Sequence, residues 1–186
     1  MALYWRAFGR QILPLPVRAA RGQALLLRCL HPFRALSAEA DGALIGVIGL
    51  RDASGGLFGP EPAQIQAIWP GGTGRILNAA TRLHRAGPAS DEMVIDGIVV
   101  APAWRGRGIA PPLVRAATAE AAARGFAGLR AEVAPRNRAA LALYQSLGFT
   151  QIAQARIGWP WSRLLSGKAR IMRLALRPLP GCPPSP

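Results

Sequence analysis

The sequence predicts one mixed α/β (α+β) domain in which helices flank a mostly antiparallel sheet. The 186 residues are 51% hydrophobic, enough for a single domain with a substantial core. In the first half, Asp41-Gly42 lies between two apolar segments and is a strong signal for a two-residue β-hairpin turn. The second half alternates strand-like and helical segments in the order β-α-β-α-β, which favours a parallel strand pair at the centre of the sheet.

The first 30 residues have helical periodicity that prolines interrupt. Pro14 and Pro16 break the pattern, so we expect a short helix from about Tyr4 and a second one from about Val17 to Leu30. Both helices are amphipathic and basic.

The hairpin and the segment after it complete the first half. Its two strands are expected at Phe33–Glu39 and Leu44–Leu50. Arg51 to Gly74 is rich in glycine and proline and is expected to be irregular, after which Thr73 should cap a helix that runs to about Arg85.

The second half consists of regular segments joined by short turns. They are strand Val94–Val100, helix Ile109–Arg124, strand Gly128–Val133, helix Arg138–Leu147, strand Thr150–Ile157 and strand Ala169–Leu176. We expect residues 1–177 to form a single domain and the proline-rich tail, residues 178–186, to be disordered.

The net charge of +14 and the pI near 11.8 would attract any polyanion. Lys168 is the only lysine among 23 basic residues. The arginines are scattered and are not interleaved with aromatic residues, as they would be on a surface that stacks single-stranded nucleic acid. We interpret the charge as compositional, and nucleic acid is the less favoured partner.

The two cysteines and the lengths of the apolar runs bear on the cellular location of the protein. Cys29 and Cys182 are far apart, so neither a disulfide framework nor a metal site follows from them. No apolar run reaches the roughly 18 residues of a membrane span, and no secretory signal is evident. We therefore expect a cytoplasmic protein with no metal and no membrane partner.

The sharpest local feature is a strand that runs through a glycine turn into a helix. The strand Ile98-Val99-Val100 is followed by Arg105-Gly106-Arg107-Gly108 and then by the helix that begins with Ile109-Ala110. Glycines let the backbone approach a ligand, and free N–H groups with the positive end of the helix dipole converge on one point. Such a turn is typical of pyrophosphate binding, although a glycine turn alone is weak support.

The chain resembles the GNAT superfamily of acyl-CoA N-acyltransferases over Met93 to Phe149. Arg105, Gly108 and Ala110 match the Arg/Gln-x-x-Gly-x-Gly/Ala signature of that family. A second block follows at the usual distance, with Asn137-Arg138-Ala139-Ala140, Leu143-Tyr144 and Leu147-Gly148-Phe149. The resemblance implies a sheet that is splayed between its two central strands, with acetyl-CoA as co-substrate.

The resemblance also implies roles for individual residues. The main chain of Ile98 and Val100 would pair with the pantetheine arm like an added strand. Tyr144 would face the thioester sulfur and protonate the departing thiolate. The implied cofactor contacts are Ile98, Val99, Val100, Arg105, Gly106, Arg107, Gly108, Ile109, Ala110, Asn137 and Tyr144, with the pyrophosphate on the N–H groups from Gly106 to Ala110 and charge from Arg105 and Arg107.

Pro111 and Pro112 depart from the expected donor pattern, because proline is tolerated in a first helical turn but lacks an N–H. If the pyrophosphate normally takes a donor at residue 111, Arg105 or Arg107 must compensate for a charge-assisted hydrogen bond worth about 1.5–3 kcal/mol.

Several site assignments have alternatives. Asp96 is the first candidate for the base that deprotonates the amine, and Glu132 is the second. Without the resemblance, Tyr144 would be read as a core residue and Asn137 as a helix cap only. The first two helices and the loop Trp159–Arg163 should form the acceptor pocket. The alternatives for the aromatic residues of that loop are that they cover the core or form a homodimer contact.

The predicted function is direct transfer of an acetyl group from acetyl-CoA to a primary amine of a small molecule or a peptide. The alternative is a basic RNA- or ribosome-associated protein with a regulatory or vestigial acyl-CoA site. Salt-dependent RNA binding without turnover would favour the alternative.

Overall fold

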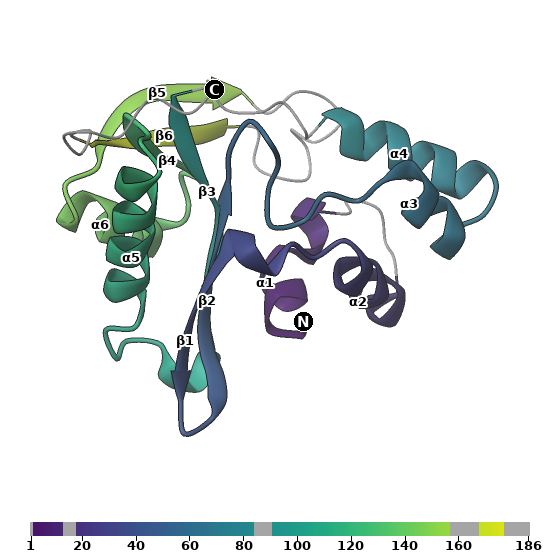
Figure 1. The fold of residues 1–186 in the computed structure, drawn as a ribbon, viewed down its shortest axis with the longest axis horizontal. Coiled ribbons are helices and arrows are strands. Elements are labelled where there is room, and N and C mark those ends of the chain that lie inside the picture. The colour runs from purple at the N-terminus through teal and green to yellow at the C-terminus, as the bar shows by residue number, and fades with distance from the viewer. Residues whose placement is uncertain (1, 13–17, 84–90, 157–167, 177–186) are drawn as a thin grey trace.

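The computed structural model describes residues 2–12, 18–83, 91–156 and 168–176, and Figure 1 draws the helices on both sides of a central sheet. The α-helices are α1 (Ala2–Ile12), α2 (Ala19–Arg28), α3 (Pro62–Ile68), α4 (Gly72–Leu83), α5 (Ala110–Ala123) and α6 (Arg138–Ser146). The 3₁₀ turns are η1 (Pro32–Arg34) and η2 (Pro102–Trp104). The strands are β1 (Ala35–Ala40), β2 (Ala43–Arg51), β3 (Glu92–Val100), β4 (Gly128–Val133), β5 (Thr150–Arg156) and β6 (Lys168–Ala175).

The strands form one six-stranded sheet in the order β1-β2-β3-β4-β6-β5. β3 and β4 are parallel, and every other neighbouring pair is antiparallel. The predicted crossover from β3 through α5 to β4 is therefore confirmed, and so is the mixed, mostly antiparallel sheet flanked by helices.

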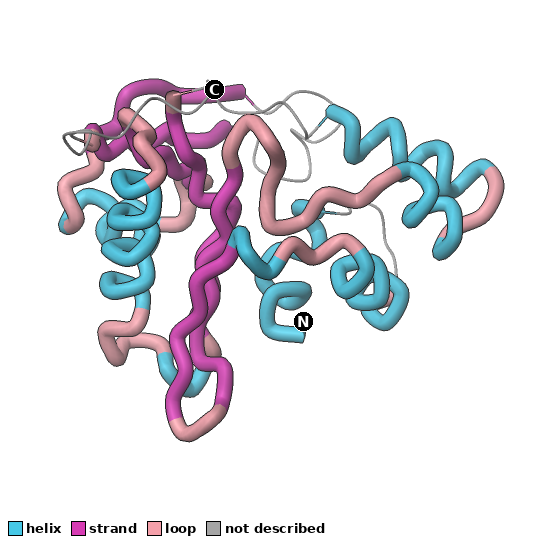
Figure 2. The backbone as a smooth tube through the Cα atoms, in the orientation of Figure 1, coloured by secondary structure: helices cyan, strands magenta, loops and turns pink. Residues whose placement is uncertain are grey.

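Two hydrophobic layers cover the two faces of the sheet. On one face, α5 and α6 pack on β2, β3, β4 and β6, with Ile48, Met93, Leu129 and Met172 almost fully buried beneath them. On the other face, α1 and α2 pack on β2 and β3 around Tyr4, Leu26 and Val99. Figure 2 shows the helices lying on the two sides of the strands.

The hairpin turn has the conformation that its sequence predicts. Asp41 and Gly42 have φ of 51° and 71°, the left-handed values that a two-residue type I′ turn requires at both positions. Ala40 and Ala43 pair directly on either side of the turn. The preceding segment begins with η1, so β1 starts at Ala35 and not at Phe33 as expected.

Between the hairpin and β3 the structure differs from the prediction. The segment expected to be irregular contains α3, whose N-cap Glu61 and Gln64 form a reciprocal capping box with Pro62 in the first turn. These short-range bonds compensate for the glycine- and proline-rich surroundings. α4 begins at Gly72, so Thr73 lies inside the first turn and is not the cap.

A buried carboxylate fixes the end of β2 to two other elements. Asp52 accepts hydrogen bonds from Arg34 of η1 at 2.8 Å, from the Ser54 hydroxyl at 2.6 Å, and from Arg124 at the end of α5. Burial alone would raise the pKa of Asp52, but these hydrogen bonds outweigh burial and hold that pKa well below its usual range. Asp52 is therefore a structural anchor.

Candidate functional site

The central parallel strands separate along their length. β3 and β4 pair only from Glu92 with Gly128 to Ile95 with Ala131. Beyond those pairs β3 continues to Val100 and β4 to Val133. The predicted splay is present, because the last five residues of β3 have no strand partner on the β4 side among the residues that the structure describes.

The space between the last five residues of β3 and the end of β4 is called the gap. The alternation of hydrogen bonds between β2 and β3 decides which backbone groups of β3 face it. The Ala101 N–H donates to the Ile45 carbonyl at 2.8 Å, so every second residue back along β3 bonds to β2. Val99 belongs to that bonded set and directs its side chain to the α1 face. Ile98 and Val100 have the opposite phase, so their N–H and C=O groups point toward the gap.

The glycine turn after β3 presents an open backbone surface. Gly106 and Gly108 have φ of 74° and 75°, and a Cβ added to either would meet no atom within 4 Å. A residue with a side chain would be strained at both positions. Ile109 is the N-cap of α5, and Ala110 is its first residue, so the positive end of the helix faces this turn.

Two arginines of the turn have defined contacts. Arg105 donates from Nε to the Val100 carbonyl at 3.2 Å. The Arg107 guanidinium lies over the Trp104 ring, 5.1 Å from the ring centroid. Both arginines are exposed, so their remaining N–H groups can reach an anion at the turn.

α6 begins at the predicted position and orients its two implied site residues differently. Asn137 is the N-cap, and its Oδ1 accepts a hydrogen bond from the Ala140 N–H at 3.1 Å. Tyr144 is only 3% exposed and packs on Phe149 with a ring centroid distance of 5.0 Å. Burial raises the pKa of Tyr144, so the phenol keeps its proton at neutral pH and can act as an acid.

Asp96 lies on the opposite face of the sheet. Ile95 and Gly97 pair with consecutive residues of β2, so Asp96 is the extra residue of a β-bulge. Arg51 forms an ion pair with it, the Nε to Oδ1 distance being 3.3 Å. A Cβ on Gly97 would lie 2.9 Å from the Tyr4 hydroxyl, which places α1 directly over this part of β3.

The direction of Glu132 follows from its neighbours. Leu129, Ala131 and Val133 enter the core under α5 and α6, so by strand alternation Glu132 lies on the other face. Its side chain is 45% exposed and accepts a hydrogen bond from Arg130 Nη2 at 3.3 Å. Glu132 is one residue beyond the last β3–β4 pair, beside the gap.

The structure therefore places the candidate acid and the candidate bases on different faces of the sheet. Tyr144 lies on the α5 and α6 face, and Asp96 and Glu132 lie on the α1 face, with the gap between β3 and β4 separating them.

Sequence reasoning did not single out the arginines beside the carboxylates, Arg51 and Arg130. No motif marks them among so many scattered arginines. The loop Trp159–Arg163, predicted as part of the acceptor pocket, lies outside the described residues, as does the tail 178–186.

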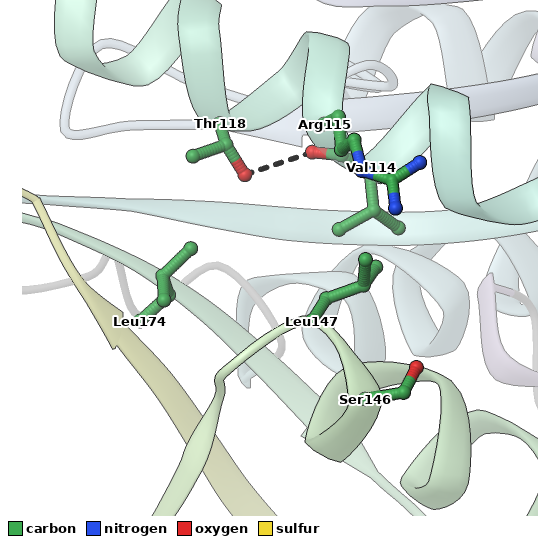
Figure 3. A pocket seen from close by; sticks show the side chains of 6 residues that line it. All are labelled: Val114, Arg115, Thr118, Ser146, Leu147 and Leu174. Carbon is green, nitrogen blue, oxygen red and sulfur yellow. Dashed lines mark hydrogen bonds between the residues drawn. The ribbon is translucent and has the colours of Figure 1, made fainter.

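A cleft of about 320 Å³ opens between α5, α6 and β6. Figure 3 shows Leu147 and Leu174 below Val114, with the Thr118 hydroxyl donating to the Val114 carbonyl at 2.9 Å. The other lining residues are Arg115 and Ser146. None of the residues implied in cofactor binding lines this cleft.

Metal sites and membrane-spanning helices are both absent from the described residues. No group of three or more His, Cys, Asp or Glu residues there could hold a metal ion. None of the helices there is long and apolar enough to cross a membrane.

Comparisons with known proteins agree with this geometry. The family model described as "Acetyltransferase (GNAT) family" matches residues 1–149. No curated protein sequence matches the chain.

Solved structures with the same fold include several acetyltransferases. An N-acetyltransferase from Staphylococcus aureus Mu50 is 19% identical, with a TM-score of 0.57, and the match covers 95% of this chain and 90% of that one. The ribosomal-protein-S18-alanine N-acetyltransferase from Escherichia coli is 20% identical, with a TM-score of 0.52 and coverage of 90% and 82%. A Salmonella typhimurium protein solved with its cofactor acetyl-CoA is 22% identical, with a TM-score of 0.51 and coverage of 86% and 72%. At these identities the likeness shows the fold alone.

Proposed function

The chain belongs to the GNAT acetyltransferase family and is an acyl-CoA-dependent acetyltransferase, and we propose that it transfers the acetyl group directly to a primary amine. The observation that carries the proposal is the gap between β3 and β4 with an open glycine turn at its wide end, together with candidate acid and base residues on the two faces of the sheet.

The residues of the site suit acetyl-CoA. The gap-facing N–H and C=O groups of Ile98 and Val100 can bond an extended amide-containing arm as an added strand would. The left-handed Gly106 and Gly108 leave open space where a pyrophosphate can approach the backbone. Arg105 and Arg107 supply positive charge at the same place, where Pro111 and Pro112 supply no N–H.

The acetyl thioester is what acetyl-CoA contributes to the reaction. The incoming amine must lose a proton to become a nucleophile, and a carboxylate on the α1 face accepts it. The C–N bond forms as the C–S bond breaks, Tyr144 donates its phenolic proton to the departing sulfur, and the second proton that the nitrogen loses on becoming an amide restores the phenol. Burial raises the pKa of Tyr144, so the phenol is protonated when the substrates bind.

The structure bears on the choice of base. Asp96 and Glu132 are each paired with an arginine at 3.3 Å, so the ion pairs do not separate the two candidates, but the Asp96 side chain is only 20% exposed. Glu132 is 45% exposed and stands at the edge of the gap. On this geometry we propose Glu132 as the group that meets the amine, with Asp96, the first sequence candidate, as its competitor.

The acceptor class is tested by measuring CoA release and the mass of the product with tri-alanine, Nα-acetyl-lysine, spermidine and kanamycin. N-acetylserine amide, which offers only a hydroxyl, is the matched control. Release with at least one amine and none with the hydroxyl is expected. Binding of acetyl-CoA without turnover of any amine would contradict the proposal and favour a vestigial site.

A further inference from the structure

Four charged side chains of alternating sign cross the α1 face of the sheet from β6 to the gap. Arg173 of β6 pairs with Glu92 of β3, Glu92 is next to Arg130 of β4, and Arg130 pairs with Glu132. The strand register supports this order, because Arg173 and Arg130 are direct cross-strand partners.

The buried end of this row is firmly fixed. Glu92 is 8% exposed, and its Oε1 accepts a hydrogen bond from Arg173 Nε at 2.5 Å. Gly128 makes room for that contact, because a Cβ there would lie 3.0 Å from Arg173 Nε and 3.1 Å from its Nη2. A buried carboxylate needs such partners, since leaving one unpaired is costly.

Arg130 connects the fixed end to the exposed end. Its Nη1 is 3.9 Å from Glu92 Oε2, and its Nη2 is 3.3 Å from Glu132 Oε1. The rigid fork of a guanidinium can face two carboxylates at once, which the single ammonium of a lysine does less well. The Arg130 side chain is 20% exposed and that of Glu132 is 45% exposed. The more buried arginine therefore restrains the more exposed glutamate.

We propose that Arg130 is a positioning residue: anchored by Glu92, it holds the Glu132 carboxylate at the edge of the gap. The inference rests on the proposed function, in which Glu132 accepts the proton of the amine. An unrestrained glutamate samples several rotamers, and restricting them raises the fraction of time that its carboxylate faces the reacting amine.

The test is a double-mutant cycle on Arg130→Gln, Glu132→Gln and the combined variant, assayed with the fastest acceptor of the amine panel. Arg130→Gln should lower kcat about tenfold, because misplacing a catalytic group reduces the productive fraction. The KM for acetyl-CoA and the cofactor-induced rise in Tm should stay unchanged. In the Glu132→Gln background, Arg130→Gln should have no further effect on kcat. Arg130→Lys keeps the positive charge, so its kcat should fall less than that of Arg130→Gln. This conservative variant also controls for misfolding of Arg130→Gln.

Arg115→Gln removes an exposed arginine of α5 and is the matched control, with no change expected. An equal drop in kcat on both backgrounds, or no drop in either, would overturn the positioning role while leaving the acetyltransferase intact. Full activity of Glu132→Gln would overturn both the base and its positioning. Absence of amine turnover by the unaltered protein would overturn the proposed function itself.

Discussion

Arg105 bonds the carbonyl of Val100, a backbone group that faces the gap and that a cofactor arm would use. This hydrogen bond connects the glycine turn to β3, the strand that precedes it. Arg105→Gln should therefore weaken acetyl-CoA binding about tenfold or more, since a charge-assisted hydrogen bond from Arg105 to the pyrophosphate would contribute about 1.5–3 kcal/mol. Isothermal titration calorimetry measures the loss. Arg21→Gln, an exposed arginine of α2, is the control, and an unchanged Kd for Arg105→Gln would remove this residue from the site.

Gly108→Ala should abolish most of the rise in Tm that acetyl-CoA causes, because the left-handed turn is lost and a Cβ stands where the phosphates approach. Gly42→Ala is a close control, since Gly42 has φ of 71° against 75° for Gly108 and equally open surroundings, but lies in the hairpin. Both variants should lose about 1 kcal/mol of stability. Only Gly108→Ala should lose the ligand effect, which differential scanning fluorimetry records. An equal acetyl-CoA-induced rise in Tm in the two variants would show that the glycine turn does not contact the cofactor.

Tyr144→Phe should keep acetyl-CoA binding and lower kcat by about 10²–10⁴-fold, the usual contribution of a general acid. The ring and its packing on Phe149 remain, so folding should be unaffected. Because burial raises the pKa of Tyr144, the unaltered enzyme should show no loss of the acid up to about pH 10, the ordinary tyrosine value. Unchanged turnover under conditions limited by chemistry would return Tyr144 to a purely structural role.

The two carboxylates can be separated by comparing Glu132→Gln with Asp96→Asn. Glu132→Gln should reduce kcat by about 10²–10⁴-fold, as expected for a general base. Asp96→Asn should cost less than about tenfold, because the Asp96 side chain is less accessible to an incoming amine, 20% exposed against 45% for Glu132. Stopped-flow rates of the chemical step are the measurement. The reverse ranking would make Asp96 the base, as the sequence first suggested.

Asp52→Asn should destabilise the fold at pH 7 by about 3 kcal/mol, because Arg34 and Arg124 lose a buried partner. The folded-state pKa of Asp52 is lowered, so its ionisation stabilises the fold above the unfolded-state value of about 3.9. That stabilisation is lost as pH falls from there toward the lower folded-state pKa. Urea unfolding at pH 7 and near pH 3 should show the gap between Asp52→Asn and the unaltered protein narrowing on acidification; a constant gap would contradict this account.

Much of the architecture could be read from local patterns. The hairpin at Asp41-Gly42, the β-α-β crossover and the start of α6 after Asn137 depend on residues close in sequence, and the structure confirms them. α3 escaped prediction because its reciprocal cap between Glu61 and Gln64 is a weak signal amid glycines and prolines.

The sequence by itself determined the family, the glycine turn and the residues that could carry acid–base chemistry, because each of these is a short pattern of residue types. Only the tertiary structure decided which face each side chain occupies, since a bulge at Asp96 shifts the alternation and no local rule locates it. The contact of Asp96 in β3 with Arg51 in β2 was likewise decided by folding. Glu92 and Arg173 are 81 residues apart in the chain, and such a pair forms only when the register of three strands brings it together.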